Sequence, residues 1–214
     1  MNQNELAFWQ SRIRQLLPIQ SDQELAAEQS GSRSGDFQLN RGFEQFENPI
    51  PAAVLVPIVA RSSGPTVLLT ERTPHLYDHA GQISFPGGRV EDHDKDMTGT
   101  ALRETLEEIG LHGRYIEVLS TLDRYRTGTG FVITPVIGWV REGFEIKIDE
   151  FEVARVFEVP LADVIEENNF EIQTREFKGK NHRFYVLKHD EHFIWGATAG
   201  ILRDLCHRLR PLSE

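Results

Sequence analysis

The chain has 214 residues, 39% of them hydrophobic, which is enough for one sizeable core. Its net charge of −10 argues against binding to bulk nucleic acid or to an anionic membrane. A single cysteine, Cys206, cannot form an intrachain disulfide and fits a reducing compartment. No stretch approaches the roughly 20 apolar residues of a spanning helix, and the N-terminus does not look like a secretory signal. We therefore expect a cytoplasmic protein.

The N-terminal part predicts one amphipathic helix followed by a polar segment. Residues 4–17 carry apolar side chains at helical spacing, and Pro18 would end that helix. The apolar face requires a partner, either the main domain or a second subunit, so a homodimer is one expectation. Residues 20–48 are polar, with linker composition at 31–35. We predict an extension over residues 1–49 and one domain over residues 50–210.

The domain opens with strands and then alternates between helices and strands. The apolar run at 52–60 predicts a buried strand, and a turn at 62–65 leads to a second strand at 66–72. A short strand is expected at 82–85, before a pair of glycines and a helix. This order indicates an α/β layered domain.

Further strands and helices are expected toward the C-terminus. The predicted elements are strands at 114–125 and 131–140, a strand in 151–161, a short helix at 161–167, a hairpin of 170–177 with 182–187, and a helix at 197–209 that buries Cys206. The connection at 126–130 either lies over a site or is a plain hairpin loop. His189 and His192 have no partners that complete a zinc pattern, and we expect them to be exposed to solvent.

Most of the candidate catalytic and metal-binding residues lie in one stretch from Phe85 to Leu111, FPGGRVEDHDKDMTGTALRETLEEIGL. Residues three and four apart are neighbours on a helix, so Glu104, Glu107 and Glu108 share one patch, and Arg103 can pair with Glu107. The other face is apolar and would pack on the core: Leu102, Thr105, Leu106 and Ile109. Carboxylates that repel one another suit a hard cation such as Mg²⁺ or Mn²⁺, although a solvated acidic face is the alternative.

This stretch resembles the Nudix box, G-x5-E-x7-R-E-U-x-E-E-x-G-U, in which U is a bulky aliphatic residue. The matching positions are Gly88, Arg103, Glu104, Glu107, Glu108, Gly110 and Leu111. Thr105 stands at an aliphatic position, and the loop before Arg103 is one residue longer than the pattern. The upstream acidic position is therefore open among Glu91, Asp92 and Asp94.

The preceding segment, LLTERTPHLYDHAGQISFPGG, resembles the motif of the coenzyme A pyrophosphatases of the Nudix superfamily, LLTxR-[SA]-x3-R-x3-G-x3-FPGG. Thr73 replaces the small residue of that motif, and Tyr77 replaces its second arginine. The resemblance implies the Nudix fold, a mixed β-sheet between α-helices. It also implies a metal-dependent hydrolase of coenzyme A or its thioesters, which releases adenosine 3′,5′-bisphosphate and 4′-phosphopantetheine.

Carried over residue by residue, the resemblance makes Glu104 and Glu108 metal ligands. Glu107 would be a further ligand or the base that activates water, held by Arg103. Glu152 is a candidate fourth carboxylate or base, or else an exposed acid. Gly87 and Gly88 would shape the turn below the helix. Arg72 and Arg89 are candidate phosphate contacts, or surface ion-pair partners.

Two alternatives to this assignment stay open. The first keeps the hydrolase but changes its substrate to ADP-ribose, a dinucleoside polyphosphate or another nucleoside diphosphate derivative, because of the differences at Thr73 and Tyr77. The second is a module that senses nucleotides without catalysis. The intact set of three acids argues against the second, since a sensor has no use for mutually repelling carboxylates.

Overall fold

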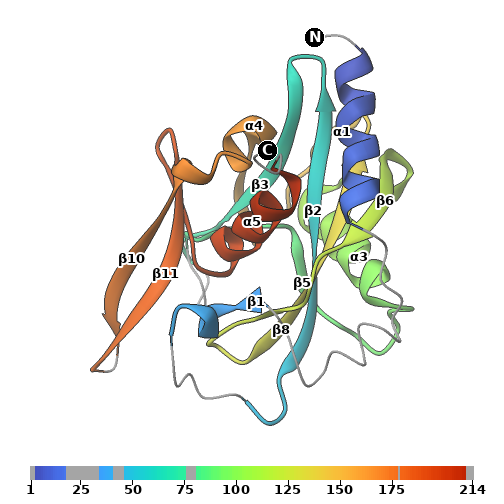
Figure 1. Ribbon diagram of the computed structural model, residues 1–214. Helices are drawn as coiled ribbons and strands as arrows, with labels where there is room; N and C mark the ends of the chain where they lie inside the picture. Colours follow the sequence, from blue (N-terminus) through green and yellow to red (C-terminus); the bar gives the residue numbers. More distant parts are fainter. Residues whose placement is uncertain (1–2, 18–33, 41–45, 76–80, 178, 211–214) are drawn as a thin grey trace.

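The computed structural model describes residues 3–17, 34–40, 46–75, 81–177 and 179–210 (Figure 1). Within them, a nine-stranded sheet contains β1 (Ser34–Gly35), β2 (Ile50–Arg61), β3 (Gly64–Arg72), β4 (Ile83–Ser84), β5 (Gly87–Arg89), β6 (Ile116–Thr121), β7 (Tyr125–Arg126), β8 (Phe131–Val140) and β9 (Val153–Pro160). A three-stranded sheet contains β10 (Phe170–Phe177), β11 (Lys180–His189) and β12 (His192–Trp195). The helices are α1 (Gln3–Leu16), α3 (Met97–Ile109), α4 (Leu161–Val164) and α5 (Gly196–Leu209), with short 3-10 helices η2 (Asp36–Gln38), η3 (Gly113–Tyr115) and η4 (Glu167–Asn169).

Strand β2 is the centre of the larger sheet. It pairs in parallel with β8 along the length from Ile50 to Val59, and β8 pairs antiparallel with β6 and β7 on its other edge. The two apolar runs predicted as strands are thus neighbours in the middle of a mixed sheet. Strands buried on both faces show continuous apolar runs, which explains why these segments were recognisable in the sequence.

The second edge of β2 is shared by two strands. Residues Ile58 to Arg61 pair with β3, as expected for the hairpin, whereas residues Ala52 to Val54 pair with β5. Beyond Val67, β3 diverges from β2 and pairs with β4 instead, while β9 pairs along the opposite edge of β3 from Thr66 to Arg72. The amide of Leu55 donates to the carbonyl of Pro86 at 2.9 Å, just inside this divergence. The sheet therefore forks beside the glycine pair.

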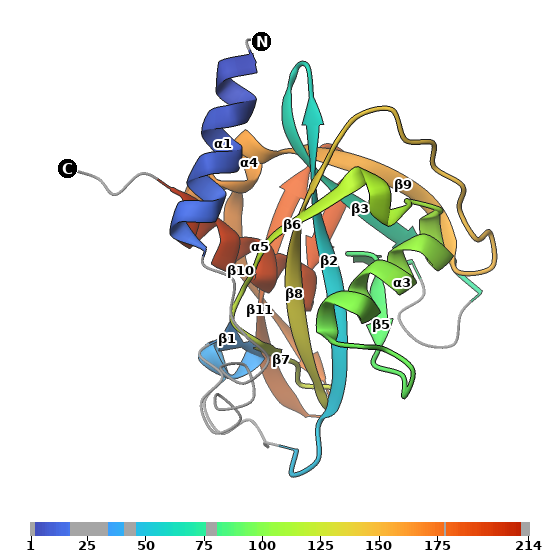
Figure 2. The same cartoon turned by 90° about the vertical axis from the view of Figure 1, so that its right-hand side faces the viewer.

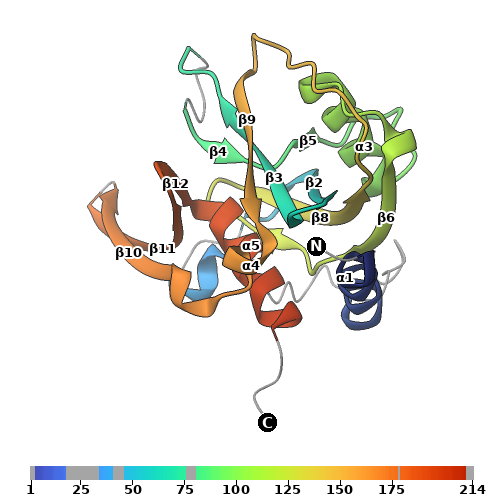
Figure 3. The same cartoon turned by 90° about the horizontal axis from the view of Figure 1, so that it is seen from above.

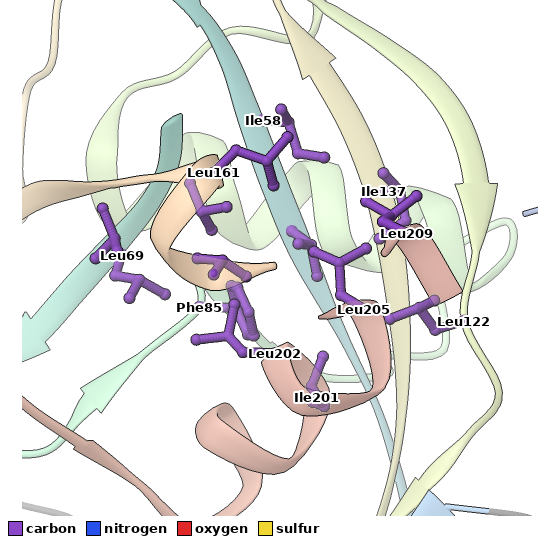
Figure 4. Packing of buried hydrophobic residues seen from close by; sticks show 14 of the residues in the cluster. Ile58, Leu69, Phe85, Leu122, Ile137, Leu161, Ile201, Leu202, Leu205 and Leu209 are labelled. Carbon is purple, nitrogen blue, oxygen red and sulfur yellow. The ribbon is translucent and has the colours of Figure 1, made fainter. Parts of the chain in front are cut away.

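Helices cover both faces of the larger sheet, as Figure 2 shows, with α1 and α5 on the left of β2 and α3 on the right. The residues of β2 alternate between the two layers. Leu55 and Val59 pack toward α3, whereas Val56 and Ile58 belong to the core shared with α5. Figure 4 shows Leu202, Leu205 and some of the other apolar side chains of that core. The expected Nudix arrangement, a mixed sheet between helices, is confirmed.

The smaller sheet stands beside α5 (Figure 3), and its first two strands form the expected hairpin. Phe177 pairs directly with Lys180, so the connection is tighter than the 178–181 segment predicted. Gly179 has a φ of 72°, a left-handed conformation that glycine adopts without strain. The third strand, β12, leads directly into α5, whose buried Cys206 confirms another expectation.

Helix α1 packs on its own chain. Ile13 and Leu17 are fully buried in the core that contains Leu205 and Leu209 of α5. The apolar face thus has the main domain as its partner, which removes the reason for expecting a second subunit there. The division into residues 1–49 and 50–210 stays a prediction. Among the described residues, every helix is too short or too polar to traverse a lipid bilayer.

The expectation that His189 and His192 are exposed is wrong. The imidazole of His192 is buried and stacks on the ring of Phe157, with the centroids 3.7 Å apart. Nδ1 of His189 lies 3.2 Å from Oδ2 of Asp163. Both lie on strands of the smaller sheet, whose packing against β9 and α4 no local sequence pattern reveals.

The 127–130 connection is a hairpin loop. Thr127 and Phe131 exchange hydrogen bonds across it, and the amide of Gly128 donates to Oδ2 of Asp36 at 2.7 Å. The hydroxyl of Tyr125 donates to the other carboxylate oxygen of Asp36, also at 2.7 Å. The loop is therefore held against η2, and the hairpin alternative is the one observed.

Candidate active site

Helix α3 has clear signals at both ends. Oδ1 of Asp96 accepts a hydrogen bond from the amide of Gly99 at 2.7 Å, which satisfies one of the free amides of the first turn. At the other end Gly110 has a φ of 68° and closes the helix as its C-cap. Both residues delimit the segment that carries the acids.

The glycine pair allows the helix to sit directly on β5. Gly87 has a φ of 154°, and a Cβ there would lie 2.4 Å from the carbonyl oxygen of Ala53. A Cβ on Gly88 would lie 2.5 Å from the carboxylate of Glu104. A larger residue at Gly87 would push β5 away from β2, and a larger residue at Gly88 would displace the carboxylate of Glu104. The predicted role of both glycines in shaping this turn agrees with the geometry.

Glu108 is the most buried acid of the helix, with 6% of its side chain exposed. The amide of Gly87 donates to its carboxylate, and Nη1 of Arg72 lies 4.0 Å from Oε1. Burial raises the pKa of Glu108 to about 8, with Glu152 and Glu104 adding to the rise and Arg72 opposing it. Among the described residues, nothing bonds to Oε2 of Glu108 or to Nε of Arg72, although both atoms are buried.

The predicted division of α3 into an acidic and an apolar face is partly wrong. Glu108 points into the protein beside Thr105 and Ile109, whereas Leu106 is 43% exposed. The helix sits over the fork of the sheet, where the glycine turn and Arg72 supply polar neighbours for a buried carboxylate. Glu104 is largely covered, while Glu107 lies at the rim with 60% of its side chain exposed. The exposure of the three acids to solvent therefore increases from Glu108 to Glu104 to Glu107.

Arg103 organises the exposed side of this patch. Its Nη1 donates to Glu104 at 2.9 Å and to Glu107 at 3.1 Å, which confirms the expected pair with Glu107. Burial raises the pKa of Glu104, and the bond from Arg103 partly opposes that rise. The guanidinium also donates to the backbone carbonyl of Arg89 at 3.2 Å, which ties the helix to β5.

Asp94 is the upstream acid that reaches Arg103. Its two oxygens accept from Nε and Nη2 of Arg103 at 2.8 and 2.9 Å, and one of them also accepts from the hydroxyl of Thr100 at 2.8 Å. These bonds hold the pKa of Asp94 far below its usual value. Glu91 is exposed and 3.8 Å from Arg103, and Asp92 is exposed. The extra residue of the loop thus falls between Asp94 and Arg103.

Glu152 immediately precedes β9 and faces the helix acids. Its charge contributes to the raised pKa of both Glu104 and Glu108, after the larger effect of burial. No cation among the described residues pairs with its carboxylate. The sequence suggested Glu152 only through the resemblance, and the structure brings it to the acids from a segment more than forty positions away.

The two predicted phosphate contacts occupy different places. Arg72 lies next to Glu108, whereas the guanidinium of Arg89 lies over the ring of Phe131, 5.4 Å from its centroid. Successive residues of a strand point to opposite faces, so Arg89 faces away from the side on which Gly88 meets Glu104. The geometry favours Arg72 over Arg89. Tyr77 lies outside the described residues.

The donor set fits a hard divalent cation. In the described part of the chain no three His, Cys, Asp or Glu side chains are already arranged to hold a metal ion, and Arg103 engages Glu104 and Glu107. The unpartnered Oε2 of Glu108, and the burial of its carboxylate that raises its pKa, are nevertheless what a bound cation would compensate. All the donors are oxygens, which suit Mg²⁺ or Mn²⁺.

Buried and half-buried carboxylates on a capped helix, seated on a glycine turn in a mixed sheet, suit a divalent metal ion. The chain belongs to the Nudix family: the family model described as the NUDIX domain matches residues 49–179. Nudix hydrolases act on nucleoside diphosphate derivatives and generally use divalent ions such as Mg²⁺ or Mn²⁺. The chain is therefore an enzyme of that class.

Three similar proteins illustrate the relationship. The chain is 40% identical to "Uncharacterized Nudix hydrolase NudL" of Shigella boydii serotype 4 over 168 residues, which are 78% of this chain and 85% of that protein. It is 39% identical to the protein of the same name in Escherichia coli O1:K1, with the same coverage. Among solved structures, the Nudix hydrolase RenU of M. smegmatis is 23% identical, with a TM-score of 0.47 over 56% of this chain and 75% of that one.

Proposed function

We propose that this Nudix hydrolase cleaves the diphosphate of coenzyme A or of its thioesters. The observation that supports this proposal is the course of the LLTER…FPGG segment. It ends β3 at Arg72, passes through β4 and turns back at Gly87 and Gly88 below Glu104 and Glu108. The described parts of this segment thus border Glu104 and Glu108, which supports a role for them in binding substrate.

Glu104 and Glu108 are the proposed metal ligands, with Glu107 as a further ligand at the rim. A divalent ion bound there would neutralise charge on the diphosphate, orient it and lower the pKa of a water molecule. Arg72, whose partly exposed guanidinium lies 4.0 Å from Glu108, would donate to a phosphate oxygen. Arg103 holds Glu104 and Glu107 in place through its anchor on Asp94.

Glu152 is the proposed general base. It faces Glu104 and Glu108 and has no paired cation among the described residues, whereas Glu107 is held by Arg103. A carboxylate without such a partner is free to accept the proton of a water molecule whose pKa a bound metal ion would lower. The water oxygen then attacks one phosphorus, the bond from that phosphorus to the bridging oxygen breaks, and the bridging oxygen leaves on the other phosphate. The products are adenosine 3′,5′-bisphosphate and 4′-phosphopantetheine.

A substrate panel tests the proposal. Coenzyme A, acetyl-coenzyme A, ADP-ribose, NADH and a dinucleoside polyphosphate are incubated with Mg²⁺ or Mn²⁺, and products are identified by mass spectrometry. We expect 4′-phosphopantetheine to form fastest, and the Glu108→Gln variant to produce none. Faster cleavage of ADP-ribose or of a dinucleotide would overturn the substrate assignment while leaving the hydrolase intact. Nucleotide binding without any metal-dependent product would support the sensing module instead.

A further inference from the structure

The segment that leads to Glu152 is fastened to the C-terminal end of helix α3. The amide of Lys147 donates to the carbonyl of Ile109 at 2.9 Å, and the amide of Asp149 donates to the carbonyl of Glu108 at 2.8 Å. These carbonyls belong to the last turn of the helix, where intrahelical partners run out. The chain before Glu152 therefore completes the hydrogen bonding of the helix that carries the acids.

Asp149 then forms a tight turn around the residues that follow. Its carbonyl accepts from the amides of Glu152 and Val153, at 3.0 and 2.8 Å, and Oδ1 of its side chain accepts from the amide of Phe151 at 2.9 Å. A side-chain oxygen that bonds to the amide two residues on is a standard way to fix a turn. Asp149 thus determines where β9 begins.

Thr73 fastens the same peptide from the other side. Its amide donates to the carbonyl of Glu152 at 3.0 Å, and its hydroxyl donates to the carbonyl of Phe151 at 2.7 Å. Thr73 is buried and directly follows Arg72, the residue next to Glu108. It is also the position at which the coenzyme A motif has serine or alanine, and a serine would retain this hydroxyl bond.

We propose that Thr73 and Asp149 are positioning residues for Glu152. Together they hold the peptide between Phe151 and Glu152 against β3 and α3, so that the Glu152 carboxylate faces the metal-binding acids. The inference rests on the role proposed above for Glu152. It explains how a base from a distant part of the chain keeps its place. The backbone of Glu152 is bonded to Thr73, the residue after Arg72, and to Asp149, whose own amide is bonded to the helix that bears Glu108.

Kinetics of substituted enzymes test the inference on the full chain. Thr73→Val removes the hydroxyl bond with little change in volume, and we expect kcat to fall about tenfold with KM within about twofold, because misplacing a catalytic group lowers the rate of the chemical step. Thr73→Ser should restore most of kcat. Asp149→Ala removes a solvent-exposed carboxylate and should lower kcat about threefold. The control is Glu150→Ala, which removes the neighbouring exposed carboxylate and should leave kcat at the wild-type value. Thermal unfolding identifies any variant that fails to fold.

The Glu152→Gln variant tests the base role of Glu152 separately from the positioning role of Thr73 and Asp149. That variant should lose about 100-fold in kcat, and adding Thr73→Val to it should cause no further loss, since both act through one carboxylate. A wild-type rate in Glu152→Gln would overturn the proposed base. An impaired Glu152→Gln beside a fully active Thr73→Val would overturn only the positioning role. Independent losses in the double variant, or no rescue by Thr73→Ser, would also contradict that role.

Discussion

Replacing Glu108 by glutamine should make the metal-free protein more stable and the enzyme inactive. The variant keeps the size of the side chain but cannot ionise. In the metal-free wild type the buried carboxyl has a pKa of about 8, against an ordinary value of 4.5. Folding therefore opposes its ionisation, and Glu108→Gln removes that opposition together with the proposed metal ligand.

The size of the effect depends on pH. Below about pH 4.5 the carboxyl is neutral in both the folded and the unfolded chain, so wild type and variant should be equally stable. As the pH rises, the unfolded chain ionises while the folded chain resists. At 1.36 kcal/mol per pKa unit, the wild type is less stable by about 3 kcal/mol at pH 7 and by on the order of 5 kcal/mol above pH 8.

Urea unfolding at pH 4.5 and pH 8, with EDTA and with Mg²⁺, measures this difference. We expect the variant to exceed the wild type at pH 8 in EDTA, and Mg²⁺ to stabilise the wild type alone. Glu107→Gln is the matched control, because its exposed carboxyl should not affect stability in EDTA. A variant that is less stable than the wild type at pH 8, or that retains wild-type turnover, would refute the reasoning about Glu108.

Three other predictions follow from the same structure. Gly88→Ala should fold but lose about tenfold in kcat, since its Cβ would displace the Glu104 carboxylate; normal turnover by steady-state kinetics would contradict this. Ile13→Ala should lower the free energy of unfolding in urea by about 3 kcal/mol, because Ile13 is fully buried, whereas the exposed Phe8, as Phe8→Ala, should cost under about 1 kcal/mol. Mg²⁺ should raise the melting temperature more at pH 8.5 than at pH 6, since the proton held by Glu108 competes with the ion below pH 8; an equal shift at both pH values would argue against that competition.

The elements that the sequence predicted best are those with strong local signals. The runs around Val56 and Val136 are apolar on both faces because the strands are covered on both faces, and burial of that kind is visible in composition alone. The acidic helix was also visible, since its spacing and its closing glycine, Gly110, are local features. The same holds for the pair between Arg103 and Glu107.

The features that the sequence did not reveal depend on distant contacts. The burial of Glu108 follows from the fork between β3 and β5, which places Arg72 and the Gly87 amide opposite the helix. The choice of Asp94 follows from a bidentate contact with Arg103 across a loop. His192 is buried because Phe157, from another sheet, stacks on it. Helical periodicity shows which residues share a face of a helix, but it does not show which face will meet polar groups from distant parts of the chain.

The fork in the sheet also bears on self-association. An unpaired strand edge is a template on which a second chain can add, and proteins suppress such edges by covering them. Where β3 leaves β2, the backbone of Ala52 to Val54 would be such an edge, and β5 occupies it. The turn that seats the catalytic helix is therefore also the strand that closes this edge. Efforts to alter substrate preference by replacing Gly87, whose added Cβ would meet the backbone of β2, therefore risk aggregation as well as loss of activity.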